Sequence, residues 1–193
     1  MRHMANSMVS NGLQRRELLA RMGTGLVVLT IHSAWGEISP AEARARGTPL
    51  RHFSATEGQT LEALADALLP GAREAGMAHY VDNQLSSANP LFFLKYMDYP
   101  GAYRPFYTQG LRALEQQSQF RYQRAFAQST AEEQAALLRD LAQHTPPDWG
   151  GPPAPLFYFV TRNDAVDVYY GTLEGFARLG VPYMAHILPP ERW

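Results

Sequence analysis

Cysteine is missing from all 193 residues, and lysine occurs once, at Lys95, among 17 basic residues. Without cysteine, this chain cannot form a disulfide, a thiolate metal site, an iron–sulfur cluster, a covalent c-type haem or a lipoprotein anchor. Charged residues make up only 18% of the sequence and the formal net charge is −1, so no basic surface for nucleic acid is expected. Apolar residues make up 46%, which is enough for the chain to bury a core of its own.

A hydrophobic run long enough to span a membrane is missing as well. The apolar stretch at residues 22–31 has about ten residues and is interrupted by two glycines. A membrane-spanning helix needs roughly 20 apolar residues, whereas the hydrophobic part of a signal peptide needs roughly 7–15. Arg15 and Arg16 precede this stretch in the pattern of a twin-arginine export signal. We therefore expect residues 1–46 to be an export signal and a linker.

The alternative interpretation of this segment is an amphipathic first helix that packs on the core. The stretch that follows, GEISPAEARARGTPLRH at residues 36–52, is aperiodic, as a linker after a signal should be, and favours export. Small–x–small cleavage motifs occur at residues 41–43 and 43–45, but both lie far beyond the hydrophobic run. The sequence therefore predicts export and leaves cleavage open.

Alternation of polar and apolar residues, the signature of a half-buried strand, is also lacking, and no internal repeat is present. Helical spacing recurs instead, punctuated by turns rich in proline and glycine. The sequence predicts an all-α fold, with one small helical domain over residues 47–193, aromatic-rich loops and the N-terminal export signal. The first expected helix begins at a capping box of Ser54 and Glu57, and the second follows Gly76. Two more are expected at about residues 91–98 and 102–118. A fifth follows a cap at Ser129 or Thr130, and a sixth spans about 155–170.

Catalytic motifs are scarce. The sequence has no glycine-rich nucleotide loop, no HExxH and no GxSxG, and its six histidines show no metal-binding spacing. We therefore assign no catalytic, cofactor-binding or metal-binding residue. One acidic cluster, in RNDAVD at residues 162–167, is open to two interpretations. Asp164 and Asp167 could act as an acid–base pair, but an ion-pair network is favoured, in which they join Arg162, Glu174 and Arg178.

Aromatic residues are abundant at positions that do not follow the spacing of the apolar side of a helix. Tyrosine and phenylalanine are favoured at the cores of protein interfaces, although a single aromatic-rich core would explain them equally well. The turn PGAREAG at residues 70–76 adds two charged residues, for which a salt bridge between helices or a partner contact is expected. The candidate partner contacts are Arg73, Glu74, Tyr99, Tyr103, Phe106, Tyr170, Phe176 and Tyr183.

Three stretches resemble the gluconate 2-dehydrogenase subunit 3 family, over roughly residues 55–190. They are ALADALLPGAREAGMAHYVDNQL at 63–85, YTQGLRALE at 107–115 and YYGTLEGFARLGVPYMAHILPP at 169–190. The resemblance implies the small, or gamma, subunit of a membrane-associated sugar or sugar-acid dehydrogenase complex. In such a complex a large subunit holds FAD, and a multihaem cytochrome subunit holds haem c. The family supplies no catalytic residue to assign here.

The resemblance also implies where this chain works. Small subunits of these complexes carry a twin-arginine signal and are needed for export and flavin maturation of the large subunit. This chain would then be periplasmic, on the outer face of the inner membrane, and would contact the membrane only through the complex or an uncleaved signal. The alternative is a stand-alone periplasmic enzyme that uses Asp164, Asp167 and a histidine such as His186, or a binding module unrelated to a dehydrogenase.

Overall fold

The computed structural model describes residues 31–33 and 36–180, and this part of the chain is helical, as predicted. A short antiparallel strand pair, β1 (Ile31–Ser33) and β2 (Gly36–Ile38), precedes the helices and was not expected. The helices are α2 (Pro40–Ala45), α3 (Ala55–Leu68), α4 (Met77–Leu85), α5 (Phe93–Tyr96), α6 (Tyr103–Tyr122), the 3-10 helix η1 (Phe126–Gln128), α7 (Ala131–Gln143), α8 (Ala154–Tyr170) and α9 (Leu173–Leu179).

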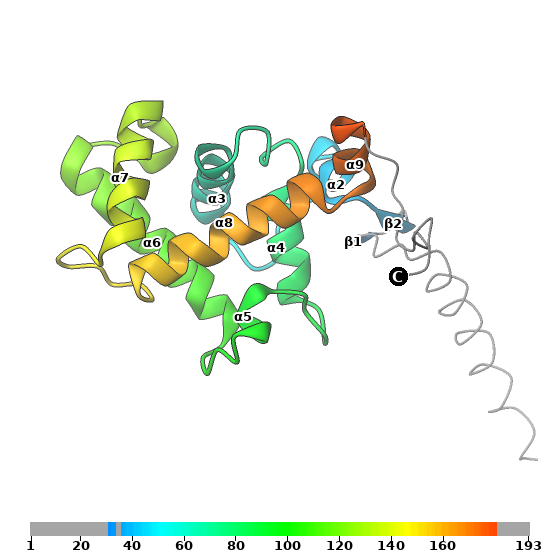
Figure 1. Ribbon diagram of the computed structural model, residues 1–193, viewed down its shortest axis with the longest axis horizontal. Helices are drawn as coiled ribbons and strands as arrows, with labels where there is room; N and C mark the ends of the chain where they lie inside the picture. Colours follow the sequence, from blue (N-terminus) through cyan, green and yellow to red (C-terminus); the bar gives the residue numbers. More distant parts are fainter. Residues whose placement is uncertain (1–30, 34–35, 181–193) are drawn as a thin grey trace, which may run out of the picture.

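Helix α8 is the element on which the others are assembled. It runs across the molecule from α7 to α9 and also contacts α3, α4, α5 and α6 (Figure 1). Helix α6 approaches it closely at Gly110, where a Cβ atom would lie 2.3 Å from the Phe157 ring. The Phe157 ring also packs against Phe106 and Trp149, with ring centroids 5.9 Å and 6.0 Å away. These contacts place α8 across the centre of the hydrophobic core.

Both predicted capping boxes are confirmed. The Ser54 hydroxyl accepts a hydrogen bond from the Glu57 N–H at 3.3 Å, and the Glu57 carboxylate accepts one from the Ser54 N–H at 2.9 Å. Thr130, rather than Ser129, forms the same reciprocal pair with Glu133 before α7. Each box satisfies N–H groups that the first turn of a helix leaves without a partner inside the helix.

Two helix boundaries differ from those predicted. Helix α5 is only one turn long, because the chain after it enters a left-handed conformation at Asp98, with φ of 50°. Helix α6 continues to Tyr122 and ends where Gln123 adopts a φ of 56°. The segment RYQRAFAQ at residues 121–128 therefore contributes its first two residues to α6 and its last three to η1, where Phe126 is fully buried.

The residues after the predicted signal are not an aperiodic linker, since they form β2 and α2. The Ser39 hydroxyl accepts a hydrogen bond from the Glu42 N–H at 3.2 Å. Pro40 occupies the first turn, where its missing N–H removes no hydrogen bond within the helix. Helix α2 contacts α4, and Ala43 is fully buried. A six-residue helix is too short to show a clear periodic pattern, which is why the sequence did not predict it.

Gly76→Ala is expected to lower the free energy of unfolding by about 2–4 kcal/mol. Gly76 has a φ of 86°, and a Cβ atom there would lie 2.1 Å from the Pro40 carbonyl oxygen of α2. Any side chain would therefore meet both an unfavourable φ and an overlap with backbone.

Chemical denaturation measures this loss, with Gly47→Ala as the matched control. Gly47 has a φ of 64°, but a Cβ atom there would have nothing within 4 Å. The control should therefore cost only about 1 kcal/mol. Equal losses in the two variants would show that the Pro40 backbone does not lie against Gly76.

Candidate partner-binding surface

The aromatic residues predicted to contact a partner are divided between core and surface. Phe106 is 1% exposed and lies between Tyr99 and Tyr107, with ring centroids 5.3 Å and 5.4 Å away. This corrects the expectation that Phe106 lies at a contact surface. It precedes Gly110 by one turn, on the side of α6 that meets α8, and helical periodicity alone could have placed it there.

The other predicted aromatic contacts are less enclosed. Tyr99 and Tyr103 are half-buried and pack against the core, and Phe176 of α9 is also half-buried. Tyr170, at the end of α8, is exposed. Tyr183 lies outside the described residues. Of this predicted set, Tyr170 is therefore the aromatic residue that the structure places at the surface.

The two charged residues of the PGAREAG turn have different surroundings. The Arg73 guanidinium donates to the Asp66 carboxylate at 3.1 Å, and the same carboxylate accepts the Gly71 N–H at 3.0 Å. Arg73 therefore fixes the turn to the end of α3, which is the salt-bridge alternative predicted for it. Glu74 is exposed, and its carboxylate lies 4.0 Å from the Arg44 guanidinium. Exposed ion pairs contribute only about 0–1 kcal/mol, so Glu74 is accessible to a partner.

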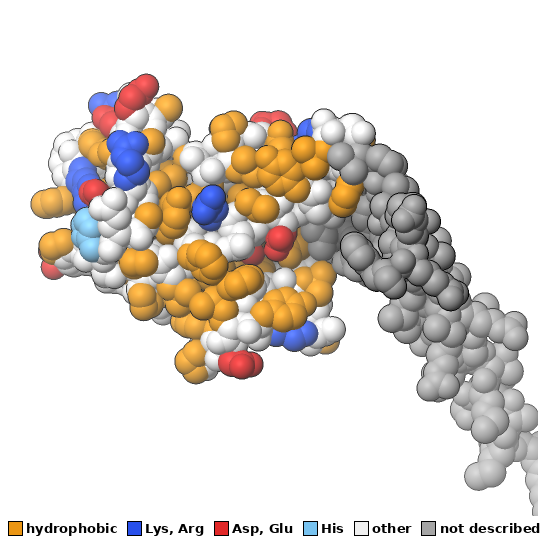
Figure 2. All heavy atoms as spheres, viewed as in Figure 1, with side chains coloured by type: hydrophobic (Ala, Val, Ile, Leu, Met, Phe, Trp, Pro, Cys, Tyr) orange, Lys and Arg blue, Asp and Glu red, His pale blue; other side chains and the backbone are white. Residues whose placement is uncertain are grey.

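A larger apolar surface covers the outer side of α8 and the neighbouring α5. Tyr96 of α5 is 68% exposed and Phe159 of α8 is 43% exposed. Phe93 joins the two helices, because its ring meets the Phe159 ring edge-to-face with centroids 5.2 Å apart. Figure 2 shows hydrophobic side chains gathered over both helices. We call this surface the α5–α8 face and define it by Phe93, Tyr96, Met97, Phe159, Val166 and Tyr170.

Opposite this surface, Asp164 of the acidic cluster turns into the core, whereas Asp167 is exposed. Asp164 is fully buried, and the Tyr107 hydroxyl donates to its Oδ2 atom at 2.6 Å, while its Oδ1 atom has no hydrogen-bond partner. The predicted ion-pair network does not form among residues 162–178 of the described chain. The Arg178 guanidinium instead stacks on the Tyr169 ring, 4.2 Å from its centroid.

Burial dominates the protonation of this cluster. It raises the pKa of Asp164 to about 8, in opposition to the Tyr107 hydrogen bond, and the nearby Asp167 carboxylate adds to the rise. Partial burial raises the pKa of Asp167, although this residue reaches the surface. Burial, together with the Asp164 charge, also raises the pKa values of Tyr80 and Tyr107. Asp164 is therefore mostly a neutral acid at pH 7, enclosed where no substrate reaches it. The geometry does not favour the acid–base interpretation.

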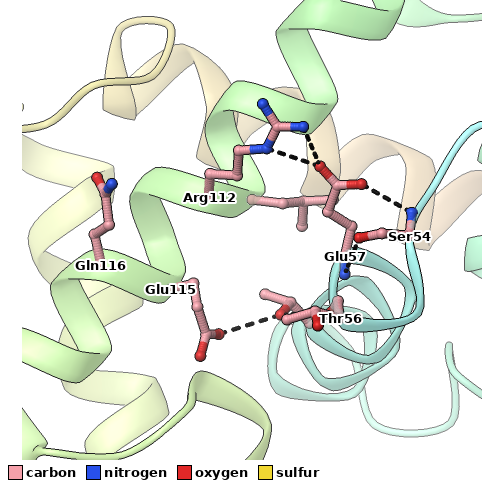
Figure 3. A pocket seen from close by; sticks show the side chains of 8 residues that line it. Ser54, Thr56, Glu57, Arg112, Glu115 and Gln116 are labelled. Carbon is pink, nitrogen blue, oxygen red and sulfur yellow. Dashed lines mark hydrogen bonds and ion pairs between the residues drawn. The ribbon is translucent and has the colours of Figure 1, made fainter.

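A groove of about 380 Å³ lies between the start of α3 and α6 (Figure 3). Its charged groups are already paired with each other or with backbone. Arg112 donates to Glu57 at 2.9 Å, and Glu115 accepts from the Thr60 hydroxyl at 3.2 Å and from the Phe126 N–H at 3.1 Å. These bonds join α3, α6 and η1, so the groove is a packing junction rather than a set of unpaired groups directed at a ligand.

Residues 31–33 and 36–180 contain neither a cluster of metal ligands nor a helix that could cross a membrane. No three His, Asp or Glu side chains in this part of the chain are grouped so that they could hold a metal ion. None of its helices combines the length and apolar character needed to cross a bilayer.

The relationship of the chain to known proteins rests on one match. Residues 55–185 match the family model described as gluconate 2-dehydrogenase subunit 3. This chain belongs to that family. The match begins at the first residue of α3 and includes the PGAREAG turn and the α5–α8 face, so it confirms the resemblance seen in the sequence. No curated protein and no solved structure matches the chain significantly.

Proposed function

We propose that this chain is the non-catalytic small subunit of a membrane-associated, FAD-dependent sugar or sugar-acid dehydrogenase complex. It binds the flavoprotein subunit and assists its twin-arginine export, flavin maturation and stability. The match to the subunit 3 family over residues 55–185 carries this proposal. The exposed α5–α8 face supports it, because contiguous apolar patches commonly mark protein interaction sites.

The cofactors of the proposed complex belong to its other subunits. FAD lies in the large subunit and haem c in a multihaem cytochrome subunit, and the complex works at the outer face of the inner membrane. Arg15, Arg16 and Tyr183 lie outside the described residues, so their roles in export and binding rest on the sequence pattern. A partner that binds before export would be carried across folded, which explains how one signal serves two subunits.

Affinity purification of the tagged full chain from the membrane fraction of its host tests the proposal. We expect a large protein with flavin absorbance to co-elute, together with haem absorbance from the cytochrome subunit. The same fraction from cells with an untagged chain is the control for non-specific binding. A colourless eluate that holds this chain alone would contradict the proposed function.

A further inference from the structure

Helix α8 exposes an apolar stripe on its outer side, in addition to the apolar side that it buries. With 3.6 residues per turn, Phe159, Val166 and Tyr170 lie within about 40° of one another around the helix axis, and all three are exposed. The opposite side is filled by residues that are fully buried, namely Phe157, Val160, Ala165 and Val168. The outer side of α8 therefore exposes a narrow apolar stripe between the charged residues Arg162 and Asp167, and an exposed apolar patch with a polar border is typical of a protein interaction site.

The longest helix of the described chain shows the contrasting pattern. The outer side of α6 carries polar residues, including Gln109, Arg112 and Gln116. This is the arrangement expected for a helix that faces water. The apolar stripe is therefore a property of α8 and its neighbour α5, whereas the polar outer side of α6 exposes one large apolar side chain, Phe120.

Two exposed charged residues of α8 border this stripe, Arg162 on one side and Asp167 on the other. Arg162 is exposed and follows Phe159 by three residues and precedes Val166 by four, so it borders both on the helix surface. It makes no hydrogen bond, ion pair or ring contact with the described residues. An arginine among aromatic residues is the composition typical of interface hot spots. A guanidinium covered by a partner needs a carboxylate to offset its desolvation.

We propose that the α5–α8 face is the docking surface for the flavoprotein subunit, through an apolar surface that places a carboxylate opposite Arg162. This inference rests on the proposed function and names the side of the molecule through which it operates. The partner surface should therefore combine a carboxylate opposite Arg162 with apolar side chains opposite the neighbouring stripe of α8. A second copy of this chain, or its residues 181–193, are the other occupants that an experiment must distinguish.

The contact can be mapped in the intact complex. A photo-crosslinking amino acid is placed at position 166 of the full chain, which is co-expressed with the flavoprotein dehydrogenase subunit of its host. We expect a cross-link to the flavoprotein from position 166. The matched control is position 120, because Phe120 of α6 is 80% exposed and does not belong to the α5–α8 face. No cross-link to the flavoprotein is expected from that position.

Binding measurements on exposed substitutions complete the test. Phe159→Ser should weaken binding of the flavoprotein subunit by about 30-fold, as expected for an aromatic hot spot. Arg162→Glu should weaken it by about tenfold or more, because it opposes the partner carboxylate. Phe120→Ser should leave the affinity unchanged. Thermal unfolding should be unchanged in Arg162→Glu and Phe120→Ser, whose side chains are exposed, and somewhat lower in Phe159→Ser, which also loses the ring contact with Phe93.

The outcomes separate this inference from the proposed function. If the wild-type chain binds the flavoprotein and all variants bind it equally, the docking surface is wrong and the proposed function stands. If the wild-type chain binds no flavoprotein, both fail. A cross-link from position 166 only to a second copy, or only to residues 181–193 of the same chain, would assign the face to that occupant and overturn the inference.

Discussion

Replacing Arg15 and Arg16 by lysine is expected to leave both this chain and the flavoprotein subunit in the cytoplasm. Lysine keeps the positive charge but lacks the planar guanidinium of arginine, so recognition of the arginine pair should be lost while the charge of the segment is kept. Cell fractionation with immunoblotting for both proteins measures the change. Dehydrogenase activity at the periplasmic face should fall to the level of a strain that lacks this chain.

Arg21→Lys is the matched control, because Arg21 lies in the same segment but outside the pair. It should leave both proteins in the periplasm. Two failures are informative in different ways. Retention of this chain alone, with normal export of the flavoprotein, would contradict the escort role. Normal export of both proteins would contradict the twin-arginine signal itself.

The stability of the folded chain is expected to fall as pH rises from about 4 to about 8, and Asp164→Asn should remove most of that fall. The pKa of Asp164 is raised to about 8 in the folded state by burial, whereas an unfolded aspartate titrates near 3.9. Between these values the folded chain keeps a proton that the unfolded chain has lost. The free energy of unfolding therefore decreases with pH, by on the order of 5 kcal/mol at most.

The sign of this effect can be checked by urea unfolding at a series of pH values. The contribution of Asp164 is fully present below about pH 4 and is lost above about pH 8, so Asp164→Asn should be more stable than wild type at pH 8.

Asp140→Asn is the control of opposite sign. A hydrogen bond from Arg121 lowers the pKa of Asp140 in the folded chain. The contribution of Asp140 to stability is therefore lost as pH falls through this lowered pKa. The slope between pH 4 and pH 8 should therefore persist in this variant. A wild-type slope that survives in Asp164→Asn would show that Asp164 is ionised in the folded chain.

Local signals predicted much of the helical architecture. The capping signals at Ser54 and Thr130 located the starts of α3 and α7, and the turn PGAREAG at residues 70–76 follows the end of α3 directly. These features act within four residues, so they can be recognised in a sequence. Helix α2 was missed because its stability depends on burial of Ala43 against other elements, which a short sequence window does not reveal.

The residues of the α5–α8 face were harder to predict from the sequence than the helices. Of the six residues of the α5–α8 face, the sequence singled out Tyr170 alone as a contact. Phe159 and Val166 are spaced like core residues, and only the positions of Phe157 and Val168 on the opposite side of α8 show that the helix has two apolar stripes. Two stripes on one helix are a signal that a helical wheel could have revealed.

The inward direction of Asp164 has a different origin. Its partner Tyr107 is 57 residues away in the sequence, on another helix. The charged neighbours in RNDAVD suggested ion pairs, because side chains one turn apart on a helix can meet. The packing of α8 on α6 decided otherwise, since it turned Asp164 towards the tyrosine and Arg162 towards the outside. Only the arrangement of the helices in space contains that information.

The burial of α2 bears on how proteases can act on this chain. The AEA and ARA motifs at residues 41–43 and 43–45 lie inside α2 and share Ala43, which is fully buried. A protease acts on exposed, unstructured chain, so cutting at either motif requires α2 to detach first. That local opening loses the Ser39 cap and the pair between Arg44 and Glu62. A chain cut there would also lose the Pro40 carbonyl that packs on Gly76. The start of α4 would then be exposed to solvent.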